Sequence, residues 1–302
     1  MLNRTQIPVW FVPERTNFWS FQRCEPRWVN HDGAPSWFDR FGLFPGQIVA
    51  NLLYYFAEPD DLVVDPFAGS GTTGLVCADF RVRYRMFDLT PRAPDIKQCD
   101  SSAKLPLRDG EAGLLFLDPP YWQMHRYSED RRDLSTMELK EFVAASTRAV
   151  REATRVLRVG GHLAILMNSV WRNVSAHFDH PLDLSMLFYW IASSEGLVLV
   201  ERISIANQNF ENPAGRHARR GRTRVAMLRG FRDLMVFRKK AVPAQVAEPQ
   251  AKEPRTAETS SDDRAPKKDS PVVPAGRSKS TKGSSSQGRR LSTGKPKRKA
   301  RP

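Results

Sequence analysis

The chain has 302 residues, 40% of them apolar, which is enough for one large domain or two small ones with a sizeable core. No apolar run approaches the roughly 18 residues of a membrane span, and residues 1–10 lack the charged-then-apolar pattern of a signal peptide. The net charge of +14 favours a polyanionic partner such as nucleic acid, although basic segments also serve solubility.

Cysteine usage predicts a reducing compartment. Cys24, Cys77 and Cys99 are far apart in the chain, odd in number and without the spacing of metal ligands. Disulfides and structural zinc sites need paired or closely spaced cysteines. We therefore expect a cytoplasmic protein without structural zinc or another metal.

The N-terminal 43 residues leave two interpretations open. Between residues 18 and 41 they hold Trp19, Trp28, Trp37 and several arginines. They form either a small cap on the core or part of a DNA-contacting surface. The catalytic domain is expected over 44–240, beginning with an amphipathic helix whose apolar residues are Ile48, Val49, Leu52, Leu53 and Phe56.

Short β-rich runs then alternate with helical patterns, which predicts an α/β fold with a doubly wound, mostly parallel sheet. The predicted strands are Leu62–Asp65, Arg83–Asp88, Asp95–Cys99, Gly113–Leu117, His162–Met167, Leu197–Ala206 and Arg232–Lys239. A capping box at Ser135–Glu138 predicts the start of a helix that Gly160 and Gly161 end, and another helix is expected over 181–195.

A glycine-rich loop, residues 65–74, follows the first predicted strand and opens a helix. Glycines let a ligand approach the backbone, and the helix N-terminus offers free N–H groups. Thr72 follows Gly71 where a P-loop would have lysine, so a P-loop is excluded. A dinucleotide, S-adenosylmethionine and a simple connecting turn remain. For S-adenosylmethionine, Asp65 would lie near the cationic end and Asp88 would accept two ribose hydroxyls.

A second motif, Asp118-Pro119-Pro120-Tyr121, follows the strand Gly113–Leu117. Two prolines cannot continue a central strand, and they fix an extended backbone. The Asp118 carboxylate and the Pro119 carbonyl can accept hydrogen bonds from an amino group, and the Tyr121 ring can stack on an extruded base. Alone, the motif could be a turn with a packed tyrosine. Two such motifs at strand ends indicate one ligand cleft.

The two motifs together resemble those of the DNA amino-methyltransferases, which modify adenine N6 or cytosine N4. The resemblance runs from about 40 to 240 and includes residues 155–161 and 234–239. It implies a Rossmann-like class I methyltransferase with a seven-stranded sheet, an antiparallel last strand and S-adenosylmethionine as the cofactor. It implies that Asp118, Pro119, Pro120 and Tyr121 are catalytic. The cofactor residues that it implies are Phe44, Pro45, Asp65, Pro66, Phe67, Gly69, Ser70, Gly71, Thr72, Asp88, Asp100 and Ser101.

DNA contacts are expected from a basic loop that contains Arg216, Arg219, Arg220, Arg222 and Arg224. Its alternative is a solvated surface loop. Residues 241–302 carry 15 Lys+Arg against 6 Asp+Glu and few large apolar residues, which predicts a disordered basic tail.

Adenine N6 is the preferred target because cytosine-N4 enzymes more often have serine at the position of Asp118. The rival functions are a cytosine-N4 enzyme, an RNA base methyltransferase, a nicotinamide dehydrogenase and a non-catalytic nucleic-acid-binding protein. A DNA substrate would place the protein at the nucleoid in the cytoplasm.

Overall fold

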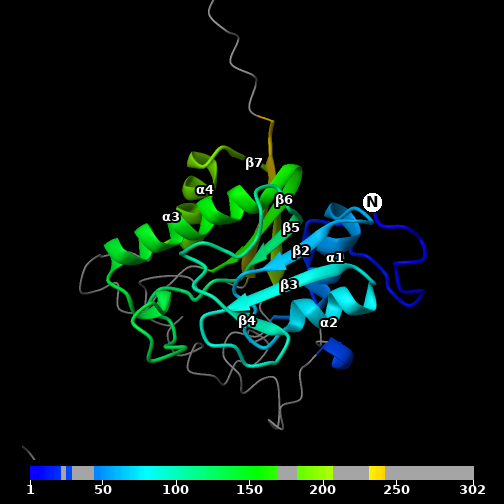
Figure 1. Ribbon diagram of the computed structural model, residues 1–302. Coiled ribbons are helices and arrows are strands. Elements are labelled where there is room, and N and C mark those ends of the chain that lie inside the picture. The colour runs from blue at the N-terminus through cyan, green and yellow to red at the C-terminus, as the bar shows by residue number, and fades with distance from the viewer. Residues whose placement is uncertain (22–24, 29–43, 169–181, 207–230, 242–302) are drawn as a thin grey trace, which may run out of the picture. The chain divides into compact units, whose positions relative to one another are not determined.

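The computed structural model describes residues 1–21, 25–28, 44–168, 182–206 and 231–241, all of which belong to one unit of the chain (Figure 1). Three predicted features lie outside these ranges: the basic loop with Arg216, Arg219, Arg220, Arg222 and Arg224, the side chain of Trp37, and the tail after residue 241. They stay predictions.

One eight-stranded sheet runs through the described residues, in the order β1-β7-β8-β6-β5-β2-β3-β4 (Figure 1). The strands are β1 (Phe18–Trp19), β2 (Leu62–Asp65), β3 (Arg83–Asp88), β4 (Ile96–Gln98), β5 (Ala112–Leu117), β6 (Leu157–Met167), β7 (Leu197–Ala206) and β8 (Phe231–Lys239).

The connectivity confirms the predicted doubly wound fold. From β2 the chain adds β3 and β4 on one side and β5 and β6 on the other, all parallel, while β8 is antiparallel to both β6 and β7. The expected number of seven strands is corrected to eight, because Phe18 and Trp19 pair with Ser204 and Ile205 at the edge of the sheet. A two-residue strand leaves no period-2 pattern to read in the sequence.

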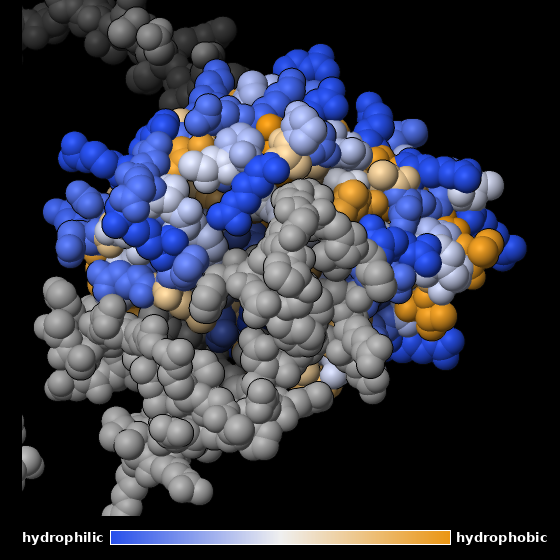
Figure 2. All heavy atoms as spheres, turned by 90° about the horizontal axis from the view of Figure 1, so that it is seen from below, coloured by the Kyte–Doolittle hydropathy of each residue, from blue (hydrophilic) through white to orange (hydrophobic). Residues whose placement is uncertain are grey.

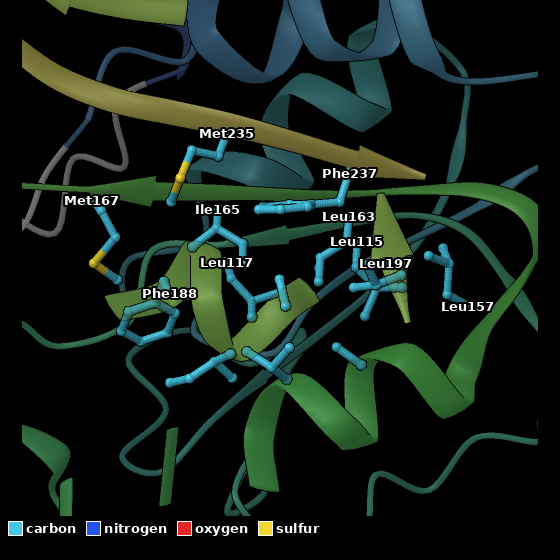
Figure 3. Close-up of a cluster of buried hydrophobic side chains, with 14 of the residues drawn as sticks. Leu115, Leu117, Leu157, Leu163, Ile165, Met167, Phe188, Leu197, Met235 and Phe237 are labelled. Carbon is cyan, nitrogen blue, oxygen red and sulfur yellow. The ribbon is translucent and has the colours of Figure 1, made fainter. Parts of the chain in front are cut away.

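Helices cover both faces of the sheet. On one face lie α1 (Gln47–Phe56) and α2 (Thr72–Asp79), and on the other lie α3 (Leu139–Val156) and α4 (Leu184–Ser194). Figure 3 shows the core on the α3–α4 face, which includes Met235 and Phe237 of β8, Ile165 of β6 and Phe188 of α4. Alternating side chains of each strand therefore enter two separate cores.

The described part of the N-terminal segment packs against the α1–α2 face. Trp19 and Trp28 are buried, and the indole N–H of Trp28 donates to the Asp79 carboxylate over 2.9 Å. The backbone N–H of Glu14 donates to Asn51 Oδ1 of α1 over 2.7 Å. These described residues thus pack on the core, and the role of residues 1–43 stays a prediction with its two alternatives.

Two helix boundaries differ from the sequence prediction. Ser135 and Thr136 form no capping box; they lie in a 3-10 turn, Leu134–Thr136, whose N-cap is Asp133, and α3 starts after Glu138 without a side-chain cap. At the other end α3 stops at Val156 and β6 begins at once. Gly160 and Gly161 lie inside β6, where Gly161 allows close approach to the backbone of β5.

On the face that Figure 2 shows, the described residues are mainly hydrophilic, with apolar side chains in small separate groups. Among the described residues, no helix has the length and apolar character to cross a bilayer.

A partly buried ion pair joins strands at the edge opposite the glycine loop. Asp61 precedes β2, and its carboxylate accepts from Arg158 Nε over 2.9 Å and from Nη2 over 3.2 Å. Gly113 of β5 leaves the necessary space, because a Cβ there would lie 1.9 Å from Asp61 Oδ1.

We expect Gly113→Ala to lower the free energy of unfolding by about 1–3 kcal/mol, the usual cost of overpacking. The added methyl group must displace the Asp61 carboxylate from Arg158. Denaturant unfolding of both single variants and the double variant Asp61→Ala/Gly113→Ala measures the coupling. A Gly113→Ala cost that is the same with and without Asp61 would contradict this explanation.

Candidate active site

Three carboxylates gather where β2, β3 and β5 end. Asp65 pairs with Met86 of β3, and its neighbour Val64 pairs with Leu115 of β5. Asp88 and Asp118 therefore stand two residues beyond the level of Asp65, on the strands that flank it. Because side chains alternate along a strand, all three carboxylates point to the α1–α2 face of the sheet.

Asp65 is the deepest of the three, with 1% of its surface exposed. Its carboxylate accepts from Thr73 Oγ1 of α2 over 2.5 Å and from the backbone N–H of Phe67 over 2.9 Å. Burial raises the pKa of Asp65 to about 7; these two hydrogen bonds oppose the rise, and the charges of Asp118 and Asp88 add to it. Asp65 thus fixes the loop to α2, and its hydrogen bonds offset only part of the cost of burying its charge.

The glycines of the loop have separate roles. Gly69 and Gly71 have φ of 53° and 90°, a left-handed conformation that favours glycine. No described atom lies within 4 Å of the position that a Cβ of Gly69 would take, whereas a Cβ on Gly74 would lie 2.4 Å from Met86 Cε. Gly74 therefore serves helix–strand packing, and Gly69 leaves the backbone open to a ligand. Ser70 is half-buried beside it, and Thr72 is buried at the start of α2.

Asp88 orders the outer side of this loop. Its Oδ2 accepts from the backbone N–H of Gly69 and its Oδ1 from that of Thr90, over 2.8 and 2.9 Å. Each oxygen keeps a second lone pair for a ligand hydroxyl. Asp88 is half-buried, so these lone pairs are accessible from the loop's open side.

The loop after β4 contacts the glycine loop directly. The buried Ser101 hydroxyl donates to the carbonyl of Pro66, and Asp100 Oδ1 accepts from the N–H and the hydroxyl of Ser102 over 2.9 and 2.8 Å. The segment before α1 reaches the same strands, since the ring of Phe44, preceding the buried Pro45, lies 4.9 Å from that of Phe116. The structure thus places Asp88 and Ser101 in direct contact with the glycine loop, and Phe44 against the neighbouring strand β5.

The Asp118-Pro119-Pro120-Tyr121 motif begins directly after β5, so the prolines end the strand as expected. Asp118 keeps some exposed surface, yet burial raises its pKa to about 6, while Arg232 and a hydrogen bond from Tyr121 hold it lower. The Tyr121 hydroxyl donates to Asp118 Oδ1 over 3.0 Å. The tyrosine ring is 8% exposed and packs in the α3–α4 core, so in this structure it presents little surface for stacking.

Asp133 fixes the segment that follows the motif. This buried carboxylate accepts from the backbone N–H groups of Tyr127, Ser128 and Ser135, over 3.1, 2.7 and 3.0 Å. The indole of Trp122 donates to the carbonyl of Met137 over 2.9 Å. These hydrogen bonds therefore hold the chain between β5 and α3 in one conformation next to Asp118.

Arg232 is a site residue that the sequence did not reveal. It lies at the start of β8, and its charge acts on Asp118, Tyr121 and Tyr127. In the sequence it is only the first basic residue of a predicted strand, so nothing marks it as part of the site. The register of the sheet, which brings it to the same edge as Asp118, is what identifies it.

The described thiols lie outside this chemistry. Cys77 is buried in α2, where burial raises its pKa, and burial also raises the pKa of the half-buried Cys99. Within the described ranges, no three His, Cys, Asp or Glu side chains are grouped as metal ligands would be.

The raised pKa of Asp65 predicts a pH-dependent stability. Between about pH 4, the ordinary range of an aspartate, and pH 7, the folded protein holds a proton that the unfolded chain has lost. The free energy of unfolding therefore falls as pH rises through this window. In Asp65→Asn the amide oxygen can accept from the Phe67 N–H, and the amide NH2 can donate to Thr73 Oγ1. The amide does not titrate, so we expect this variant to gain up to a few kcal/mol over the parent at pH 8, at about 1.4 kcal/mol per pKa unit.

Urea unfolding at pH 5 and pH 8 tests this, with the exposed Asp60→Asn as a control for loss of one charge. Parallel pH dependence in the parent and Asp65→Asn would show that burial does not disfavour the charged carboxylate.

Part of the chain, including the glycine loop, is similar to known proteins. A family model described as DNA methylase matches residues 11–96, which include the glycine loop and Asp88. The Type II methyltransferase M.XycI of Xanthomonas campestris pv. cyanopsidis is 43% identical over 51 residues, 17% of either chain. M.Cfr9I of Citrobacter freundii, also a Type II methyltransferase, is 38% identical over 56 residues, 18% of this chain and 19% of that one.

These alignments span less than a fifth of the length of the two curated relatives. Among solved structures, TrmN from Thermus thermophilus has 18% identity and a TM-score of 0.41, over 66% of this chain and 50% of that one. Residues 11–96 are thus similar to the DNA methylase family, and short stretches of the chain are similar to the two Type II methyltransferases.

Proposed function

We propose that this chain transfers a methyl group from S-adenosylmethionine to an exocyclic amino group of a DNA base, with adenine N6 as the target. The observation that carries the proposal is the meeting of two loops at one edge of the sheet. Gly69, with its open backbone, lies in the loop that follows β2, and Asp118 directly follows the adjacent strand β5. In doubly wound sheets this switch point binds ligands.

The residues present fit the charge of S-adenosylmethionine. The compound carries a sulfonium and an ammonium group, and three carboxylates, Asp65, Asp88 and Asp118, point to one face at this edge. A cation bound there would relieve their mutual repulsion. Gly69 would admit the ligand to the backbone, and Asp88 would accept ribose hydroxyls through its remaining lone pairs. The bound compound supplies an electrophilic methyl group.

Asp118 acts on the acceptor. As a carboxylate it accepts a hydrogen bond from the amino group of the base and makes the nitrogen lone pair more available, and the Pro119 carbonyl offers a second acceptor. The Tyr121 hydroxyl orients the carboxylate. Alignment and electrostatics supply the rate, without a covalent intermediate.

Adenine is preferred over cytosine because of the identity of residue 118. Cytosine-N4 enzymes of this family more often have serine there, and the chain has aspartate. Cytosine-N4 and RNA methylation are the alternatives that product identification decides.

The proposed substrate also fits the charge of the chain, which is +14 overall. Phosphate contacts are assigned to the basic loop with Arg219 and Arg220 and to the tail, both outside the described residues. The proposed cellular location is the nucleoid in the cytoplasm.

Gly69→Ala tests the cofactor site with a matched control. Gly69 and Gly196 both have left-handed φ, 53° and 80°, and no described atom lies within 4 Å of either Cβ position. Both alanine variants should therefore be destabilised by similar backbone strain, about 1–2 kcal/mol. Gly196 precedes β7 at the opposite edge of the sheet.

We expect only Gly69→Ala to lose affinity for S-adenosylmethionine, by about tenfold or more, which corresponds to about 1.4 kcal/mol. Calorimetric titration measures it, with NAD as the comparison ligand. Equal affinities in the two variants, or tight binding of NAD by the parent, would contradict the assignment.

Asp118→Ala should reduce turnover about 100-fold or more, as loss of a preorganised electrostatic contact does. Affinity for S-adenosylmethionine should change little, because Asp118 serves the acceptor. Asp118→Asn, which keeps one carbonyl oxygen, should be less impaired. For the tyrosine the informative variant is Tyr121→Phe, because the buried ring of Tyr121 would leave a cavity if truncated to alanine.

Single-turnover methylation of DNA and calorimetry on the same preparations separate the two effects. Unchanged turnover in Asp118→Ala would refute the catalytic role. A large loss of cofactor affinity would move the residue to the cofactor side of the site.

A further inference from the structure

The sheet register brings Arg232 to the same edge as Asp118. β5, β6 and β8 align Leu117, Ile165 and Met235 in one row. Asp118 is one residue beyond Leu117, and Arg232 is three residues before Met235 on the antiparallel β8. Both offsets are odd, so Asp118 and Arg232 point to the face opposite to Leu117 and Met235. Two strand spacings separate them, about 10 Å between backbones, which an arginine side chain can bridge.

The electrostatics of the site agree with this placement. The positive charge of Arg232 lowers the pKa of both Asp118 and Tyr121, against the effect of burial. The next residue, Asp233, points to the other face and is paired with Arg202 over 2.9 Å. Arg202 is thus the ion-pair partner of Asp233, whereas the charge of Arg232 acts on Asp118 and Tyr121.

The groups that face Asp118 come from several elements. Asp65 of β2 repels its charged form, and Arg232 of β8 favours it. Burial, followed by the charge of Asp118, raises the pKa of Tyr121 well above its ordinary value and that of Tyr127 to about 12. Both phenols are therefore neutral near pH 7, and the positive charge of Arg232 favours the charged form of Asp118.

We propose that Arg232 is a positioning residue of this site. Its guanidinium keeps Asp118 in the carboxylate form and, through Tyr121, holds it in the orientation that accepts a hydrogen bond from the target amine. The role in methylation rests on the proposed function. The pairing with Asp118 itself does not, so the two can be tested separately.

Single-turnover methylation of DNA from pH 5.5 to 9, at saturating S-adenosylmethionine, measures the effect. The parent rate should rise with a midpoint near pH 6, as Asp118 ionises. Removing a nearby cation raises the pKa of a carboxyl group, so Arg232→Met should move the midpoint up by about 1–2 pH units. The rate loss should be greatest at pH 6 and shrink toward pH 9.

Arg232→Lys should restore the midpoint, and Arg202→Met, which removes an arginine from the opposite face, should leave it unchanged. A loss of equal size at every pH in Arg232→Met, with the parent midpoint retained, would overturn the proposal. So would a midpoint shift of the same size in Arg202→Met.

A second arm uses no substrate. With Arg232 replaced by methionine, a higher pKa of folded Asp118 makes the free energy of unfolding fall further as pH rises above 6. This added pH dependence should vanish in Asp118→Asn/Arg232→Met, and its persistence there would overturn the pairing. If the stability data show coupling between Asp118 and Arg232 but the parent does not methylate DNA, the pairing is supported and the proposed function is overturned.

Discussion

Burying like charges next to each other is costly, and Asp65, Asp88 and Asp118 are placed side by side by the pairing of β2 with β3 and β5. The protein offsets part of this cost with directed hydrogen bonds, from Thr73 and Phe67 to Asp65 and from Tyr121 to Asp118. The remainder leaves Asp65 with a pKa of about 7. A site in this electrostatic state gains by taking up a cation.

The three carboxylates have different partners and different structural roles. Asp65 ties β2 to α2, and Asp88 shapes the glycine loop through the N–H of Gly69. Asp118 accepts a hydrogen bond from the Tyr121 hydroxyl, and the charge of Arg232 acts on it at the same edge of the sheet. The glycine loop is thus held by bonds to its backbone and to α2, while Asp118 is held through side chains. We therefore expect a substitution at Asp118 or Arg232 to leave the conformation of the glycine loop unchanged.

Local patterns predicted the parts of the site that depend on short stretches of chain. The glycine loop and the Asp-Pro-Pro-Tyr motif each stand at a strand end, where buried runs such as Leu62–Asp65 stop. Long-range packing decided the rest. Gly160 could not be assigned to β6 from sequence, since glycine pairs usually end helices. Arg232 reaches Asp118 only through the register of three strands, and the burial of Tyr121 depends on α3 and α4.

The central claim is the methylation of an amino group of a DNA base, and mass spectrometry of nucleosides from DNA tests it most directly. DNA from cells that express the chain should contain N6-methyladenine, and DNA from cells that express Asp118→Ala should contain far less. N4-methylcytosine in its place would contradict the choice of adenine. Absence of both modified bases from DNA, or their appearance in RNA instead, would contradict the function proposed for the site.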